Sequence, residues 1–274
     1  MHLTIDYRTD YRFTHPQQRI IQSLRVTPTS HAGQTVVDWS IDVECDARLR
    51  SHVDGYGNKV TMIYIPGPVD HLSIAVSGEV FTEDTAGVVR DAAEPLPPEL
   101  FLRSTPLSAP SPAIVAFARR AAEVDRDKLA WLHLLNHEIH RRLAFDPGKT
   151  EVDTDAATAF AAGHGVCQDF AHVFLATARA AGTPARYVSG HLFRRDGAAR
   201  QPAAHAWVEA WVDHLGWVAF DPTNGICADD AYIRVATGLD YAQAAPLSGA
   251  RTGGGEERLT VDVHVTMAQS QQQN

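Results

Sequence analysis

One cysteine, Cys167, stands where a glycine turn meets a long apolar segment, and this junction constrains the fold more than any other feature. Residues 163–165 read Gly-His-Gly, which favours a turn. The segment 167–181 contains neither glycine nor proline and carries apolar residues at helical spacing, and Gly182 follows it as a stop signal. We therefore predict a helix whose first residue is Cys167.

A cysteine at the start of a helix has a chemical use. A thiol attacks a carbonyl carbon as its thiolate, which is only a small fraction of an ordinary cysteine at neutral pH. The partial positive charge and unpaired N–H groups of a helix N-terminus stabilise that anion. The same N–H groups can receive the oxyanion that forms on the attacked carbonyl. Cys167 is therefore a candidate nucleophile.

The candidate base lies on a strand further along the chain. His205 opens an alternating segment, 205–212, and shares one face of it with large rings that include Trp207, which we expect to be core or cleft wall. After a turn, the returning strand ends at Asp221, before a proline that cannot continue the ladder. Centring this hairpin on residue 213 places His205 opposite Asp221, with Cβ atoms about 4.5–5.5 Å apart. The turn residues favour a centre one or two positions later, so this register requires a bulge.

Four short segments around these residues form a set. They read Gly-Val-Cys-Gln-Asp-Phe-Ala-His at 165–172, Gly-Thr-Pro-Ala-Arg-Tyr-Val-Ser-Gly at 182–190, His-Ala-Trp-Val-Glu at 205–209 and Asp-Pro-Thr-Asn-Gly at 221–225. Together they resemble the transglutaminase-like superfamily, and most closely its bacterial branch, in which a papain-like core follows a β-rich N-terminal region. The resemblance implies a Cys-His-Asp triad. Cys167 would be the nucleophile, His205 the general base and acid, and Asp221 the orienting carboxylate.

The oxyanion site departs from the papain-like pattern. Papain-like proteases place a glutamine several residues before the cysteine, whereas residues 161–162 are both alanine here. Gln168 and His164 remain candidates for the second donor, beside the backbone N–H of Cys167, and Trp207 is a candidate supporting residue. The sequence leaves this choice open.

The pattern along the chain predicts an α+β fold. Residues 1–85 form a β-rich domain, a small sandwich or barrel, and residues 86–112 form a proline-rich connection without regular structure. The predicted strands of the first domain are 2–12, 18–28, 35–45, 48–56, 59–65 and 71–82. The catalytic core, with helices packed on an antiparallel sheet, spans 113–250 and begins with helices at about 112–123 and 126–142. Residues 251–274 hold a glycine-rich joint, a strand that we expect to return to the N-terminal sheet, and a tail, 269–274, that we expect to fray.

Composition excludes some classes of function and predicts the cellular compartment. A formal net charge of −9 argues against nucleic-acid binding, and no apolar stretch is long enough to span a membrane. Three cysteines and an N-terminus without a signal-peptide pattern predict a reducing cytoplasm. The motifs imply no cofactor and leave the oligomeric state open. We expect a peptide or protein substrate, or a small amide.

Three hypotheses on function follow. We favour hydrolysis of a peptide, isopeptide or other amide bond, with transglutaminase-type transfer to an amine as the alternative, since one triad serves both. His133, His137 and His140 share a helical stripe and could hold zinc, but His-Glu-Ile-His at 137–140 is one residue short of the hydrolytic zinc spacing. A non-enzymatic peptide-binding module would be expected to have an eroded triad, and here all three positions are filled.

Overall fold

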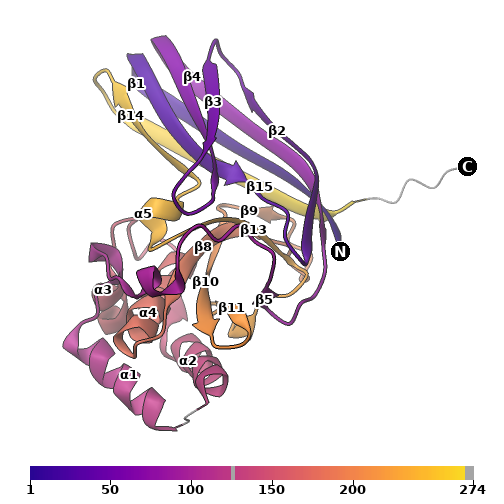
Figure 1. The fold of residues 1–274 in the computed structure, drawn as a ribbon. Helices are drawn as coiled ribbons and strands as arrows, with labels where there is room; N and C mark the ends of the chain where they lie inside the picture. The colour runs from indigo at the N-terminus through magenta and orange to yellow at the C-terminus, as the bar shows by residue number, and fades with distance from the viewer. Residues whose placement is uncertain (125–126, 269–274) are drawn as a thin grey trace, which may run out of the picture.

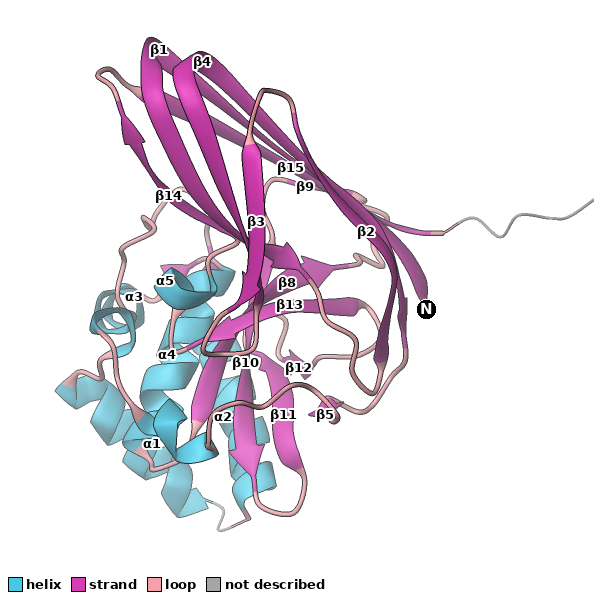
Figure 2. Cartoon of the chain, turned by 45° about the horizontal axis from the view of Figure 1, so that its top comes forward, coloured by secondary structure: helices cyan, strands magenta, loops and turns pink. Residues whose placement is uncertain are grey.

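Two antiparallel sheets organise the chain, and the helices lie together on one side of the smaller sheet (Figures 1 and 2). The structure is a computed structural model that describes residues 1–124 and 127–268. The predicted helix start at residue 126 and the fraying of the tail 269–274 lie outside the described residues. No helix in the described ranges has the length and apolar character needed to cross a membrane.

The larger sheet has seven strands and follows from the alternation in the N-terminal sequence. Its path is β2-β4-β1-β15-β9, with β14 also paired to β1 and β3 to β4. Their bounds are β1 His2–Thr27, β2 Gln34–Val43, β3 Arg48–Val53, β4 Lys59–Thr82, β9 Arg200–Gln201, β14 Leu247–Thr252 and β15 Glu257–Met267. Along β1, every second side chain is buried through most of the strand, so one face of the sheet forms a core.

The structure corrects the predicted strand boundaries. Segments 2–12 and 18–28 are one strand, β1, and segments 59–65 and 71–82 are one strand, β4. The break predicted at residues 66–68 is wrong because the two strands stay paired through register shifts near Gln17. A Cβ on Gly67 would lie 2.0 Å from the Gln17 carbonyl oxygen, so only glycine allows this close approach. Bulges of this kind let long strands bend without losing their ladder.

The C-terminal strand completes the N-terminal sheet. β15 pairs with the first half of β1, with Ile5 opposite Val265, and β14 pairs with the second half. The short strand β9 then pairs with β15, although β9 belongs in sequence to the middle of the core. The two ends of the chain and one loop of the core therefore share a sheet.

The proline-rich connection contains short regular pieces that the sequence did not predict. These are β5 Val88–Val89, which pairs with a core strand, and two 3-10 turns at Pro98–Leu102 and Pro106–Ser108. The buried guanidinium of Arg179 fastens the turns by donating to the Phe101 carbonyl at 3.0 Å and the Ser108 hydroxyl at 2.7 Å. Backbone and hydroxyl acceptors thus replace a carboxylate partner for this buried cation.

The described residues of the core contain five helices and five strands of a six-stranded sheet, whose sixth strand is β5 of the connection. The helices are α1 Pro112–Val124, α2 Lys128–Arg142, α3 Ala156–Ala162, α4 Cys167–Ala180 and α5 Tyr241–Ala244. The sheet order is β12-β11-β10-β8-β13, with β8 Ala185–Leu192, β10 His205–Val212, β11 Gly216–Asp221, β12 Ile226–Cys227 and β13 Tyr232–Gly238. α4 lies between this sheet and the other helices, and nearly all of it is buried. Its first turn is therefore held on both sides.

Candidate active site

The turn before Cys167 is fixed by a buried carboxylate. The Val166 N–H donates to Asp169 Oδ2 at 2.7 Å, and the Thr150 hydroxyl donates to the same oxygen at 2.8 Å. A Cβ on Gly165 would lie 2.5 Å from that oxygen, so the carboxylate fits because residue 165 is glycine. Burial raises the pKa of Asp169, and its hydrogen bonds partly offset this effect. As the sequence predicts, Cys167 is the first helical residue.

His205 connects Cys167 to Asp221. The Nε2 atom of His205 lies 2.7 Å from Asp221 Oδ2. The Cys167 side chain interacts with the same ring and helps to raise its pKa, and Nδ1 is the ring nitrogen that Asp221 leaves free for the thiol. The three residues come from the start of α4, the start of β10 and the end of β11. They form one line from thiol to imidazole to carboxylate.

The predicted hairpin register is wrong, although the contact that it was meant to explain is present. Trp211 pairs with Trp217, which centres the hairpin on residue 214, one position beyond the prediction. The reason is a three-residue turn in which His214 adopts a φ of 71°. In this register His205 lies opposite Gly190 of β8, and Asp221 lies opposite Ile226 of β12. The imidazole and carboxylate therefore meet diagonally rather than directly across the ladder.

Asp221 is completely buried and is surrounded by donors. Its Oδ1 accepts from the backbone N–H groups of Thr223 at 2.8 Å and Asn224 at 3.1 Å. Its Oδ2 accepts from His205, from the Asn224 amide at 2.6 Å and from the Tyr232 hydroxyl at 2.7 Å. Asn224 and Tyr232 were missed by sequence reasoning. The Asp-Pro-Thr-Asn run could have signalled Asn224, since such side chains close turns locally, but Tyr232 carries no local signal.

The electrostatics of the pair favour a charged imidazole. Burial by itself lowers the pKa of His205, but the charge and hydrogen bond of Asp221, with the hydrogen bond to Cys167, outweigh it and raise that pKa to about 10. Burial would raise the pKa of Asp221, but His205, Tyr232 and Asn224 lower it. At neutral pH the site therefore holds an imidazolium beside a carboxylate.

Two tyrosines that sequence reasoning did not single out stand beside Cys167. Tyr187 of β8 is 1% exposed, and its ring lies 5.4 Å from that of His172 and 6.2 Å from that of Tyr241. Burial and the nearby Cys167 raise the pKa of Tyr187 well above its usual value. Burial, followed by Cys167, also raises the pKa of Tyr241. Both rings therefore stay neutral phenols next to the sulfur.

The predicted supporting residues have different surroundings. The side-chain amide of Gln168 donates to the Val152 carbonyl at 2.8 Å, so it is engaged in holding a loop. His164 lies in the strand β7 His164–Gly165, beside the buried turn, and does not line the cleft at Cys167. Trp207 is 1% exposed and packs against both His205 and Tyr232, as a wall residue would. The backbone N–H groups of Cys167 and Gln168, at the start of α4, remain the candidate oxyanion donors.

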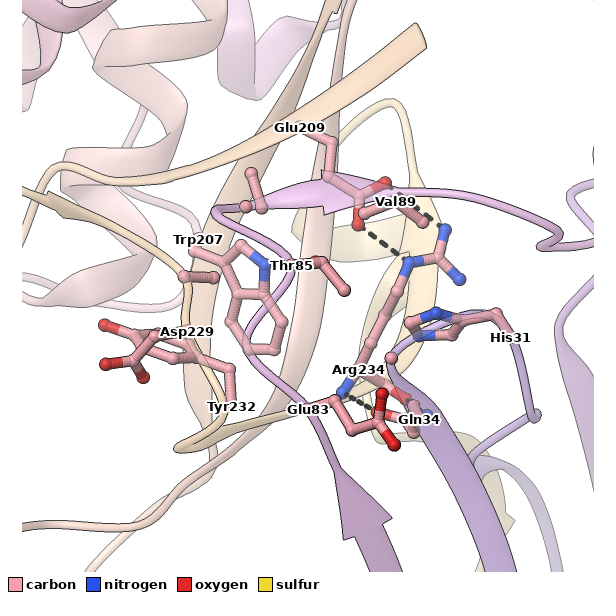
Figure 3. A pocket seen from close by; sticks show the side chains of 14 residues that line it. His31, Gln34, Glu83, Thr85, Val89, Trp207, Glu209, Asp229, Tyr232 and Arg234 are labelled. Atoms are coloured by element: carbon pink, nitrogen blue, oxygen red, sulfur yellow. Dashed lines mark hydrogen bonds and ion pairs between the residues drawn. The ribbon is translucent and has the colours of Figure 1, made fainter. Parts of the chain in front are cut away.

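Behind Trp207 lies a small polar cavity of about 40 Å³ (Figure 3). Glu209, two residues after Trp207 on β10, is fully buried there. It accepts from Arg186 Nε at 2.6 Å and Arg234 Nε at 2.7 Å. Burial would raise the pKa of Glu209, but the two arginines lower it to about 2. The strand that carries His205 is thus tied to its neighbour β8 and, beyond β8, to β13.

Two histidines of the α2 stripe contact other segments of the chain. His133 Nδ1 lies 4.0 Å from Cys227 Sγ, and His140 Nδ1 lies 2.9 Å from the Thr223 carbonyl oxygen. Among residues 1–124 and 127–268, no group of three or more His, Cys, Asp or Glu side chains is arranged to hold a metal ion. The zinc hypothesis therefore finds no support in this stripe.

A large cleft opens at the thiol. Its volume is about 990 Å³, at the upper end of the range for ligand sites, and both Cys167 and His205 line it. Tyr187 and Tyr241 lie on the same side, while Tyr7 reaches it from the N-terminal sheet. Cys167 and His205 are therefore accessible to a ligand much larger than a single amide.

Comparison with known proteins agrees with this architecture. Residues 115–222 match the transglutaminase-like superfamily, and residues 3–81 match the bacterial transglutaminase-like N-terminal region. An uncharacterized protein of Mycobacterium leprae is 30% identical over 282 residues, covering 96% of this chain and 98% of that protein. A Pseudomonas aeruginosa protein named protein-glutamine gamma-glutamyltransferase is 33% identical over 143 residues, covering 46% of this chain and 20% of that protein.

The fold has a solved counterpart. A crystal structure from Cytophaga hutchinsonii, described as a candidate cysteine protease, aligns with a TM-score of 0.79 at 21% identity, covering 98% of this chain and 91% of that one. Fold and matched regions together define an α+β protein with a papain-like core behind a β-rich N-terminal region. The chain belongs to the transglutaminase-like superfamily, in its bacterial branch.

Proposed function

We propose that this protein is a cysteine-dependent amide hydrolase with Cys167, His205 and Asp221 as its catalytic triad. The observation that carries the proposal is the arrangement of three side chains: His205 is hydrogen-bonded to Asp221, interacts with Cys167, and lines a large cleft together with Cys167. A peptide or isopeptide bond is the favoured substrate, because a cleft of about 990 Å³ has room for a ligand larger than a single amide.

In the proposed reaction, His205 holds the proton taken from Cys167, and the thiolate attacks the amide carbon. The oxyanion is received by backbone N–H groups at the start of α4. The imidazolium then gives its proton to the leaving amine, the carbon–nitrogen bond breaks, and a thioester remains. Water, deprotonated by His205, attacks the thioester and releases the carboxylic acid and the thiolate. Asp221 keeps the proton of Nε2 in place, so Nδ1 is the nitrogen that exchanges protons with the thiol, the leaving amine and water.

Transfer to an amine is the second candidate, and the similarity to a gamma-glutamyltransferase over 143 residues favours it. In that case a primary amine replaces water in the second half-reaction, and an amide is formed instead of an acid. The same three residues would serve both outcomes, since only the second nucleophile differs.

One experiment separates these outcomes. Peptide libraries are incubated with the wild type and with Cys167→Ala, with and without an added primary amine, and products are identified by mass spectrometry. Hydrolysis predicts new carboxyl ends, whereas amine transfer predicts amides that carry the added amine in place of the amine or ammonia that left. A Cys167→Ala variant that turns over substrate as fast as the wild type would contradict the proposal, because the reaction cannot proceed at that rate without its nucleophile.

A further inference from the structure

The cleft has two walls, and one of them belongs to the N-terminal sheet. Tyr7 and Tyr11 of β1 line it together with Leu259 and Val261 of β15. Tyr11 is paired with Leu259 in the ladder, and all four residues lie on one face of the sheet. The face that closes the N-terminal core therefore also faces the thiol.

The segment that leads to His205 forms another side of the cleft. After β8 the chain leaves the core sheet, pairs as β9 with β15, and returns to start β10 at His205. Leu192 and Phe193 line the cleft at the beginning of this excursion, and Pro202 lines it near the end. The Gln201 side chain donates to the Leu192 carbonyl at 2.7 Å, which holds the two ends of the excursion together.

The charges at the cleft are already neutralised. Arg194 is paired with Asp196, Arg195 with Asp229 and Asp230, and Arg200 with Asp262. Apart from the reacting pair, each charged side chain among the described residues that line the cleft belongs to one of these ion pairs. A charged substrate side chain entering the cleft would lose water without gaining a free partner.

Apolar side chains stand exposed around the same opening. Phe145 is 58% exposed, Ile226 46% and Leu259 49%, and all three line the cleft. Large exposed apolar groups gathered at one opening are typical of a binding surface. Covering them with an apolar ligand removes this surface from water, which favours binding.

We propose that the cleft selects substrates whose side chains next to the scissile amide are large and apolar, and that Leu259 and its neighbours on the N-terminal sheet are specificity residues. This inference rests on the proposed role of Cys167. It assigns the N-terminal region a part in substrate choice as well as in folding. The occupant is an uncharged, extended peptide that contacts β15 while its carbonyl lies at the thiol.

The test uses N-acetyl tripeptide chloromethyl ketones that carry Phe, Glu or Lys at all three positions. The thiolate displaces chloride and forms a thioether, so mass spectrometry reports the rate of Cys167 modification without a known substrate. Iodoacetamide, which is too small to engage the cleft walls, reports the reactivity of the thiol alone. The variants are Leu259→Lys and, as a matched control on the same strand but outside the cleft, Met267→Lys, whose parent side chain is 56% exposed.

We expect the Phe reagent to modify the wild type about 10- to 100-fold faster than the Glu and Lys reagents. In Leu259→Lys, the rate of Cys167 modification by the Phe reagent should fall about 10-fold, while the rate with iodoacetamide stays at the wild-type value. Met267→Lys should react at the wild-type rate with both reagents. Equal rates for the three peptides, or an unchanged Leu259→Lys, would overturn the inference while iodoacetamide still labels Cys167. If no reagent labels Cys167, the proposed function itself fails.

Discussion

Replacing Asp221 by asparagine should damage the site more than removing its side chain. Oδ1 faces two backbone N–H groups, which cannot become acceptors, so the oxygen of the new side-chain amide must take that place. The NH₂ group then occupies the position of Oδ2 and points at His205 Nε2. To accept this hydrogen bond, Nε2 must give up its proton. The neutral imidazole then carries its proton on Nδ1, where it faces Cys167 and cannot act as a base.

The size of the effect follows from the same contacts. Holding the imidazole in the wrong tautomer costs on the order of 10⁴ in turnover in a triad of this kind. Stability also falls, by about 1–3 kcal/mol, because the NH₂ group faces the Asn224 amide, another donor, inside a buried site. Asp221→Ala leaves room for water, which accepts from Nε2–H and keeps the working tautomer. We therefore expect turnover to fall in the order wild type, Asp221→Ala, Asp221→Asn, with His205→Ala at least as slow as Asp221→Ala.

The assay is the rate of iodoacetamide alkylation of Cys167 as a function of pH, together with ¹⁵N NMR of His205. In the wild type, the ring of His205 should be protonated at neutral pH and its Nε2 proton should face Asp221. In Asp221→Asn, alkylation of Cys167 should be slower because the imidazole can no longer act as a base, and the proton should be found on Nδ1. An asparagine variant that alkylates like the wild type, with its proton on Nε2, would refute the reasoning.

Three further predictions follow from buried groups. Glu209→Ala should lower the free energy of unfolding by about 3–5 kcal/mol in urea titrations, because Arg234 then lacks its buried partner; a loss below 1 kcal/mol would contradict this. Gly165→Ala should displace the Asp169 carboxylate, slow the alkylation of Cys167 and lower the free energy of unfolding by about 1–3 kcal/mol. Unchanged alkylation kinetics would argue against the tight contact. Burial lowers the pKa of His191 to about 4, below its unfolded value of about 6.5, so stability is lost as pH falls through this window. In His191→Phe, stability measured by calorimetry should depend less on pH in this range. The same dependence of stability on pH in both proteins would contradict the prediction.

The candidate triad could be predicted from the sequence because each member has a strong local signal. Cys167 follows a glycine turn at the head of an uninterrupted helix, and Asp221 precedes a proline that ends its strand. The prediction located His205 on the correct strand but gave the wrong register. The register depends on the conformation of the three-residue turn, where His214 and the following Gly216 both have positive φ, and the alternation of the two strands does not specify that conformation.

The contacts that complete the site could not be predicted, because they join segments distant in sequence. Tyr232 reaches Asp221 only because β13 and β11 belong to the same sheet, which sequence alternation alone does not order. The long strands were missed for a related reason. Residues 66–68 have the composition of a turn, and they continue β4 only because Gly67 packs closely against Gln17 on the neighbouring strand. Tertiary pairing, rather than local propensity, decides both cases.

The buried charges around Arg186 explain how distant segments hold the base in position. Its guanidinium donates to Glu209 at 2.6 Å and to Glu94 at 2.6 and 2.8 Å, and it lies 4.0 Å over the ring of Trp217. Burying such ions contributes little net stability, because desolvation offsets their attraction, but an ion left without its partner is costly. Any shift of β10 that separates Glu209 from Arg186 therefore carries a steep penalty. Since His205 begins the same strand, this penalty also resists its displacement from Cys167.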